Sequence, residues 1–165
     1  MFLGSGPVLS FEEQRNMIRR FELRDLSDVM EIWLGGNIDS HYFIETGFWT
    51  SNFAMVETSI VSAEVYVYID NKVILGFIGL EGDHIEGLFV KKDYRSQGIG
   101  KQLIDYAKVR HSKLSLSVYE RNSSATKFYE REGFKRMGTQ LNHYTGEVEC
   151  VMQWSSSSAQ RMKLA

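Results

Sequence analysis

The sequence has little of the two residues that most constrain a chain, cysteine and proline. Its 165 residues include one cysteine, Cys150, and one proline, Pro7. A single cysteine excludes an intramolecular disulfide and a cysteine-based zinc site, so we expect a reducing compartment and a cytoplasmic protein. Because the proline lies near the N-terminus, no proline interrupts the helices and strands expected between residues 17 and 154.

The chain also lacks an excess of either charge and any long apolar run. Its 19 Lys and Arg residues nearly balance its 21 Asp and Glu residues, and the net charge is −2. Such a balance leaves no electrostatic footprint for a nucleic acid or an anionic membrane, and we expect neither as a partner. No segment approaches the ~18 consecutive apolar residues that a membrane span needs.

Several catalytic motifs are missing as well. There is no Gly-x-Ser-x-Gly elbow, which argues against a hydrolase triad. The histidines His41, His111 and His143 show no metal-ligand spacing with one another or with Cys150, so no metal site is predicted. With 43% apolar and 24% charged residues, the composition is that of an ordinary globular protein, and 165 residues fit one domain.

Hydrophobic periodicity predicts one mixed α/β domain over residues 17–154. Residues 1–16 have neither the cationic start nor the apolar stretch of a signal peptide. We interpret them as a leader, native or added ahead of a natural start at Met17. The serine-rich residues 155–165 are low in complexity and predict a flexible tail.

The predicted order of elements is β-α-α-β-β-β-α-β-α-β-β, from alternating runs and runs with a period near 3.6. The predicted strands are Met17–Arg24, Glu64–Ile69, Val73–Leu80, His84–Val90, Lys113–Tyr119, Phe134–Leu141 and Glu147–Trp154. The predicted helices run from a cap at Asp25 to Gly35-Gly36, near Thr50–Val61, from Gly98 to Arg110, and from a cap at Asn122 to Gly133. The aromatic stretch Asn37–Phe53 predicts mainly a loop, in which we expect His41 to pack among aromatic rings.

The clearest chemical signal is the turn Arg95-Ser96-Gln97-Gly98-Ile99-Gly100, between a strand and a helix. Two glycines let the backbone approach a ligand without interference from a β-carbon. The free N–H groups of a helix N-terminus bind anions, and Arg95 can add a charge-assisted bond, so the turn suits a pyrophosphate. On this pattern alone, an alternative is that both glycines only permit tight packing of the strand against the helix. The pattern is neither a Walker A loop nor a full dinucleotide fingerprint, because Leu103 stands where the third glycine would be.

A second motif follows, and the two together resemble the GNAT superfamily of N-acetyltransferases. That family's Gln/Arg-x-x-Gly-x-Gly/Ala hallmark occurs as Arg95–Gly100, after a strand that ends Leu88-Phe89-Val90. At the expected distance lies the pattern Asn122…Ala125…Phe128-Tyr129…Gly133-Phe134. The element order matches across Met17–Trp154, and the chain is similar to small bacterial members, some of which acetylate protein lysines.

The resemblance implies the GNAT fold, a central twisted and mostly antiparallel sheet of about seven strands with helices on both faces. It also implies acetyl-CoA as co-substrate, no metal, and direct transfer of the acetyl group to a primary amine. Backbone groups of Leu88 and Val90, beside Phe89, would contact the pantetheine arm, and Asn122 would bond the same arm or cap its helix. The residues implied around the pyrophosphate are Arg95, Ser96, Gln97, Gly98, Ile99, Gly100 and Lys101, and Phe128 is placed at the cofactor site.

The resemblance assigns Tyr129 as the acid that protonates the departing thiolate. A phenol has an ordinary pKa near 10 and keeps its proton at neutral pH. The alternative is a tyrosine that packs beside Phe128, with its hydroxyl bonded to an inert group. A base is also needed, because an amine of pKa ~10.4 is largely protonated at pH 7. His84 and Glu86 lie on one strand face by the period of two, and both are candidates; the alternative is that both are solvated polar residues.

The acceptor amine is not identified by any motif. By resemblance, a protein lysine or an N-terminal amine is the first hypothesis, and a small-molecule amine is the second. A non-catalytic acyl-CoA-binding module and an enzyme acting on aminoacyl-tRNA are further alternatives, the last disfavoured by the net charge of −2. We expect Asn37–Phe53 and the turn Asn142–Glu147 to shape the acceptor site, in a monomer or a homodimer.

Overall fold

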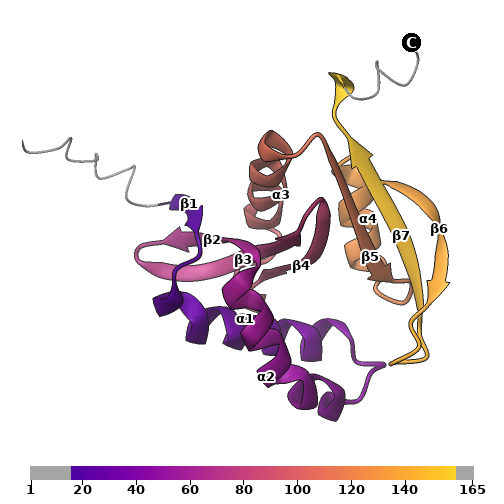
Figure 1. The fold of residues 1–165 in the computed structure, drawn as a ribbon, viewed down its shortest axis with the longest axis horizontal. Helices are drawn as coiled ribbons and strands as arrows, with labels where there is room; N and C mark the ends of the chain where they lie inside the picture. The colour runs from indigo at the N-terminus through magenta and orange to yellow at the C-terminus, as the bar shows by residue number, and fades with distance from the viewer. Residues whose placement is uncertain (1–15, 159–165) are drawn as a thin grey trace, which may run out of the picture.

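Seven strands form one sheet in the computed structural model, which describes residues 16–158 (Figure 1). The strands are β1 (Asn16–Arg20), β2 (Glu64–Asp70), β3 (Val73–Glu81), β4 (His84–Val90), β5 (Lys113–Tyr119), β6 (Lys135–Leu141) and β7 (Val148–Ser155). Their spatial order is β1-β2-β3-β4-β5-β7-β6, and every neighbouring pair is antiparallel except β4 and β5. The predicted mixed α/β fold with a mostly antiparallel sheet is confirmed. Most of the predicted leader and tail lies outside the described residues.

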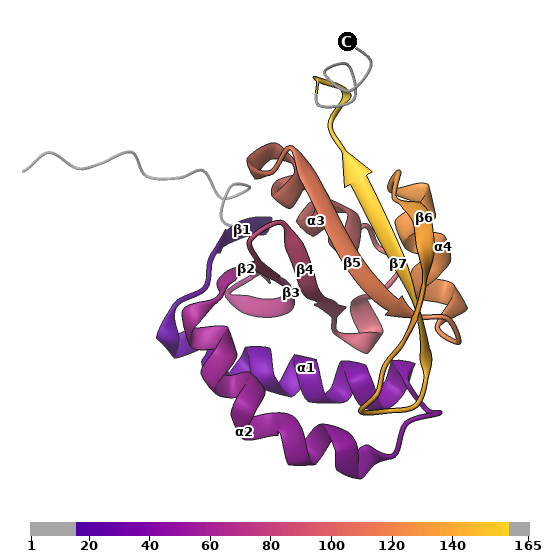
Figure 2. The same ribbon diagram turned by 45° about the vertical axis from the view of Figure 1, so that its right-hand side comes forward.

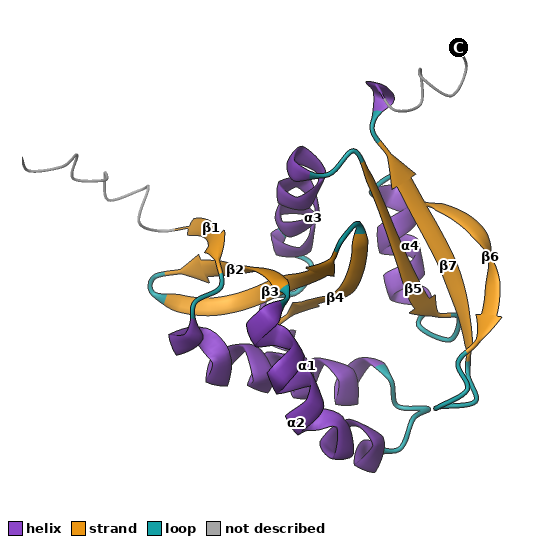
Figure 3. Ribbon diagram, in the orientation of Figure 1, coloured by secondary structure: helices purple, strands orange, loops and turns teal. Residues whose placement is uncertain are grey.

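The two parallel strands at the centre of the sheet, β4 and β5, are paired over a very short length. The ladder between β4 and β5 consists of one residue pair, His84 with Ser115. Beyond that pair the strands run apart, as Figure 3 shows. The rest of β4 therefore lacks a neighbouring strand on its β5 side, and this divergence opens the centre of the sheet.

Four helices cover the two faces of the sheet (Figure 2). They are α1 (Leu26–Ser40), α2 (Thr46–Ser62), α3 (Ile99–Arg110) and α4 (Ser123–Arg131). Two short 3-10 helices, Leu23–Asp25 and Lys92–Tyr94, precede α1 and α3. Among residues 16–158, no helix is long and apolar enough to cross a membrane.

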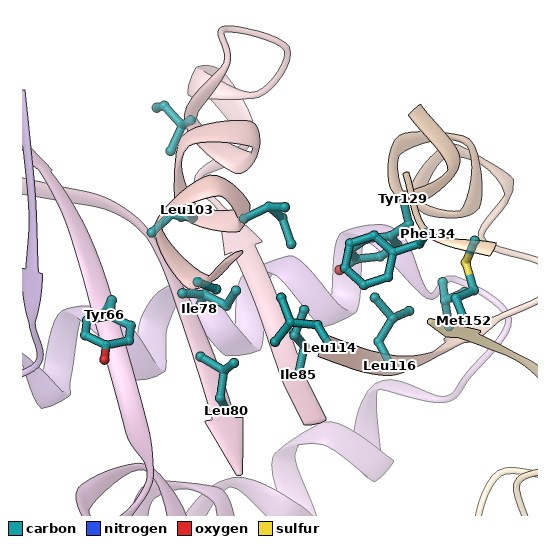
Figure 4. Close-up of a cluster of buried hydrophobic side chains, with 14 of the residues drawn as sticks. Tyr66, Ile78, Leu80, Ile85, Leu103, Leu114, Leu116, Tyr129, Phe134 and Met152 are labelled. Carbon is teal, nitrogen blue, oxygen red and sulfur yellow. The ribbon is translucent and has the colours of Figure 1, made fainter. Parts of the chain in front are cut away.

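The alternation of β2 sends its side chains into two separate cores. Tyr66 and Tyr68 belong to a cluster with residues of α3 and α4, whereas Val65 and Val67 belong to a cluster with residues of α1 and α2. Figure 4 shows the first cluster, in which Tyr129 of α4 lies beside Phe134. Strands β2 and β3 are thus buried on both faces, which explains the nearly continuous apolar sequence of β3.

The predicted end of the first helix is wrong. The helix continues through Gly35 and Gly36 to Ser40, and Gly36 is buried against the ring of Phe89. The glycine pattern was interpreted as a stop signal, whereas Gly36 permits the close approach of α1 to β4. Sequence spacing cannot distinguish these two uses of glycine, because the partner strand is distant in the chain.

The aromatic stretch is also more helical than predicted. The helix α2 begins at Thr46 rather than near Thr50, so the connection from α1 is confined to residues 41–45. Asp25 does precede α1 but makes no side-chain cap to it. Instead, the Asp25 carboxylate accepts hydrogen bonds from the guanidinium of Arg19 at 2.7 and 2.9 Å and from the N–H of Glu22 at 2.8 Å.

Candidate functional site

A cleft of about 1000 Å³ lies where β4 and β5 diverge, bordered by α3, α4 and the end of α1. It gathers most of the residues predicted for the site. The predicted residues that line it are Glu86, Leu88, Phe89, Val90, Arg95, Ser96, Gly98, Ile99, Gly100, Lys101, Asn122, Phe128 and Tyr129. Two predicted residues, His84 and Gln97, are not part of its lining.

The free edge of β4 presents backbone groups of Leu88 and Val90 to the cleft. The N–H of Lys91 donates to the carbonyl of Leu75, so residue 91 directs its backbone groups toward β3. Successive residues of a strand direct these groups to opposite sides, so residues 88 and 90 face away from β3, where β5 has diverged. The Val90 carbonyl accepts a bond from Arg95 Nε at 3.0 Å, which agrees with this orientation.

A β-bulge sets the direction of Glu86. The register between β3 and β4 shifts after the pair Gly79–Gly87, so that Leu80 pairs with Ile85 and Glu86 is the extra residue. Ile85 packs in the core beneath α3, whereas Phe89 packs in the core beneath α1. The shift occurs between them, and the exposed Glu86 side chain lines the cleft.

His84 lies at the closed end of the divergence. Its Nδ1 is 3.0 Å from the hydroxyl oxygen of Ser115, the residue with which it pairs across the strands. It lines a smaller cavity of about 400 Å³ together with Asp83 and Lys113. The structure thus separates the two predicted base candidates, and Glu86 is the one in the main cleft.

The glycine turn has the backbone geometry that an anion site needs. Ser96 and Gly98 have positive φ angles of 62° and 86°, and the first helical bond of α3 runs from Gln102 N–H to the Gly98 carbonyl. The N–H groups of residues 99–101 precede that bond and have no intrahelical acceptor. A β-carbon on Gly100 would lie 3.3 Å from the ring of Phe128, so this glycine also permits tight packing.

Tyr129 is enclosed between two aromatic rings at the cleft. The centroid of its ring lies 5.2 Å from that of Phe128 and 5.6 Å from that of Phe134, and 8% of the residue is exposed. Burial raises the pKa of its phenol well above the ordinary value, and no hydrogen bond to another described residue offsets this effect. The hydroxyl therefore stays protonated and can donate a proton into the cleft.

An aromatic wall forms part of the cleft, and two of its residues come from the stretch Asn37–Phe53 that is expected to shape the acceptor site. The wall consists of Trp33 in α1, His41 in the connection after it, Trp49 in α2 and Tyr119 at the end of β5. The indole N–H of Trp49 is buried without a hydrogen-bond partner among the described residues. Burial lowers the pKa of His41 to about 4, so its imidazole is neutral at physiological pH. The aromatic stretch between positions 41 and 53 indicated part of this wall, whereas no sequence signal indicated Trp33 or Tyr119.

Asn122 serves two partners at once. Its Oδ1 accepts a bond from the N–H of Ala125 at 3.3 Å, which confirms the predicted cap of α4. Its Nδ2 lies 3.3 Å from Nε2 of His41. Among residues 16–158 no group of three or more histidine, cysteine, aspartate or glutamate side chains could hold a metal ion.

The family model, the similar sequences and the similar structures all point to the same protein family. Residues 62–136 match the model of the acetyltransferase (GNAT) domain. The chain is 30% identical over 140 residues to the peptidyl-lysine N-acetyltransferase YiaC of Escherichia coli (strain K12), covering 84% of this chain and 96% of that protein. The solution structure of apo-form YjaB from Escherichia coli superposes with a TM-score of 0.76 at 24% identity, covering 86% of this chain and 99% of the other.

A complex with the cofactor shares the fold. The PaiA N-acetyltransferase from Thermoplasma acidophilum, solved in complex with coenzyme A, superposes with a TM-score of 0.70 at 19% identity. The match covers 85% of this chain and 98% of that chain.

Proposed function

Since the chain belongs to the GNAT family of acetyl-CoA-dependent N-acetyltransferases, we propose that its acceptor is the side-chain amine of a protein lysine. The observation that carries this proposal is the similarity to a peptidyl-lysine N-acetyltransferase along 96% of that relative's length. The chemistry of the cleft supports it. A carboxylate at Glu86 and the indole rings of Trp33 and Trp49 in the cleft lining suit an alkyl chain that ends in a cationic amine.

The residues present fit acetyl-CoA, which supplies an acetyl thioester when bound. The free N–H groups after Gly98 and the charge of Arg95 suit the pyrophosphate. The backbone groups of Leu88 and Val90 suit the amides of the pantetheine arm, which would pair with the strand edge. A β-carbon on Gly100 would lie 3.3 Å from the ring of Phe128, so a larger side chain here would require that ring to shift.

Three groups of this chain would perform the transfer. Glu86 would accept the amine proton, directly or through water, because the neutral amine is the nucleophile. The N–H at Val90, directed into the cleft, would donate to the carbonyl oxygen on which charge develops. Tyr129 would donate its proton to the departing sulfur, and its raised pKa keeps that proton in place until the thiolate forms.

The test is acetyl transfer to a matched set of acceptors. The purified protein is incubated with acetyl-CoA and a lysine-containing peptide, the same peptide with N-acetylated lysine, or a polyamine, and thiol release is measured with peptide mass. We expect thiol release that depends on a free lysine amine and a mass increase of one acetyl group. Preference for the polyamine over the peptide would replace the protein acceptor by a small-molecule one.

Native mass spectrometry separates catalysis from binding alone. An adduct of one acetyl-CoA per chain, together with no thiol release on any amine, would contradict the transfer reaction and favour a binding module. The same spectra report whether the chain is a monomer or a homodimer.

A further inference from the structure

We propose that His41 is a positioning residue, which ties the end of α1 to the N-terminus of α4, the helix that carries Tyr129. The kinetic part of the proposal rests on the proposed function, and the structural part is independent of it. His41 would act through Asn122, by holding the two sides of the cleft together, rather than by exchanging a proton with the substrate.

The amide orientations on both sides of His41 are fixed by other bonds. On α1, Nδ2 of Asn37 donates to the Trp33 carbonyl at 2.9 Å, so Oδ1 is the atom left for His41. On the α4 side, Oδ1 of Asn122 accepts from the N–H of Ala125, so Nδ2 is the atom left for His41. Each amide therefore presents one defined atom to the imidazole.

These orientations determine the tautomer of the ring. Nδ1 of His41 lies 3.1 Å from the Asn37 oxygen and must donate its proton there. Nε2 lies 3.3 Å from Nδ2 of Asn122 and must accept. Only the neutral imidazole with its proton on Nδ1 satisfies both bonds. The low pKa of His41, about 4, agrees with a ring that stays neutral.

The ring is also held by aromatic neighbours from three segments. Its centroid lies 5.8 Å from that of Phe43 in the connection after α1, 5.4 Å from that of Trp49 in α2, and 5.0 Å from that of Tyr119 at the end of β5. Phe43 and Tyr119 are themselves 5.7 Å apart. Residues from both halves of the divided sheet thus meet at His41.

The consequence for the reaction follows from the position of Asn122. Asn122 caps α4, and Tyr129 lies in the same nine-residue helix, so we expect a shift of the first turn to move Tyr129 as well. The aromatic wall of the cleft carries Trp33 and Trp49, which contact each other, and Trp49 also contacts His41. The His41–Asn122 bond therefore sets the distance between the wall that faces the amine and the hydroxyl that faces the leaving group.

Two substitutions of His41 separate its hydrogen bond to Asn37 from its hydrogen bond to Asn122. In His41→Gln the side-chain amide reaches the position of Nε2, and its oxygen can accept from Asn122. In His41→Asn the shorter amide occupies the position of Nδ1 and can donate to Asn37, but it leaves Asn122 unpartnered. Each variant keeps one of the two bonds, so similar melting temperatures are expected and differences in rate report the link to α4.

We expect His41→Gln to keep kcat/KM for the lysine peptide within about threefold of the wild type, and His41→Asn to lower it about tenfold or more. Both should bind acetyl-CoA with nearly unchanged Kd. Equal, large losses in both variants would mean that the ring acts by proton transfer, and wild-type rates in both would mean that it only fills space. Either result overturns the proposal.

Nitrogen NMR of the wild-type histidine tests the link without any turnover. The proposal requires a protonated Nδ1 and an unprotonated Nε2 on His41, and the assignment can be made by the loss of these signals in His41→Gln. A proton on Nε2 would overturn it. If the wild type acetylates no amine, the proposed function fails, and this measurement still decides the position of His41.

Discussion

The ring of Phe89 in β4 lies directly against Gly36 in α1. A β-carbon on Gly36 would be 2.7 Å from Cδ1 of that ring, a distance that real side chains do not tolerate. A β-carbon on Gly35, one position earlier, would meet nothing within 4 Å. Both glycines lie in the interior of α1, but only position 35 has space for a larger side chain.

Gly36→Ala should damage the cleft, and Gly35→Ala is its matched control. The added methyl group displaces Phe89 or α1, and overpacking of this kind costs about 1–3 kcal/mol of unfolding free energy. Gly35→Ala should instead raise stability by up to about 1 kcal/mol, because alanine favours helix. Thermal melting and Kd for acetyl-CoA check both. An unchanged Kd and melting temperature in Gly36→Ala would show that the Phe89 ring moves aside at no measurable cost in stability or binding.

Tyr129→Phe should lower kcat about tenfold or more while leaving Kd for acetyl-CoA nearly unchanged. The ring keeps its packing between Phe128 and Phe134, so only the proton donor is lost. Tyr144→Phe is the matched control, because Tyr144 is 90% exposed and lies outside the cleft lining. Steady-state thiol release is the measurement, and equal rates in the two variants would remove Tyr129 from the mechanism.

Glu86→Gln should lower kcat/KM for the amine about a hundredfold near neutral pH. Without a base, the rate depends on the free amine, so the variant's rate should continue to rise with pH while the wild-type rate levels off. His84→Asn is the informative comparison, since its amide can occupy the position of Nδ1 and keep the bond to Ser115, and the residue lies outside the cleft. A larger loss in His84→Asn than in Glu86→Gln would reverse the assignment of the base.

His111 should make stability fall as pH rises above neutrality. Partial burial alone would lower the pKa of His111, but hydrogen bonds to Asp83 at 3.0 Å and Glu64 at 3.2 Å raise it above the ordinary value. A raised folded-state pKa gives a stabilisation that is complete below the unfolded-state pKa of about 6.5 and is lost as pH rises through the folded-state pKa.

For a partly exposed pair this loss should be about 1 kcal/mol or less, or about 2–4 °C in Tm. Melting curves between pH 6 and pH 9 (approximately the range in which histidine deprotonates) check it. His111→Gln should be flat over that interval. A wild-type melting temperature that rises across it would contradict the ion pairs seen at Asp83 and Glu64.

Features encoded in local sequence were predictable. The glycines of the turn Arg95–Gly100 predicted its backbone geometry. Asn122 predicted the start of α4, and Gly133, whose φ is +89°, predicted its end. The strands from β2 to β5 followed from alternation and turn residues. The fold class and most of the cleft lining were therefore accessible from the chain alone.

What the sequence could not supply depends on contacts between distant segments. Gly36 looks like a helix terminator until Phe89 is placed beside it, and His41 looks like a loop residue until both Asn37 and Asn122 are within hydrogen-bond distance. The displacement of His84 from the cleft likewise depends on where the two central strands part. These contacts between residues distant in the sequence leave no signal in hydrophobic periodicity or motif spacing.

Because β4 and β5 pair at one residue only, the sheet is incomplete along the rest of β4. On the side of β4 from which β5 has diverged, the backbone groups of Leu88 and the N–H of Val90 have no strand to pair with, whereas the Val90 carbonyl accepts from Arg95. A molecule that pairs with these groups binds the folded chain and not the unfolded one, so its free energy of binding adds to the stability of the protein as RT ln(1 + [L]/Kd). If acetyl-CoA pairs with this strand edge as proposed, the substrate completes the sheet as well as reacting, and each turnover removes and replaces that added edge.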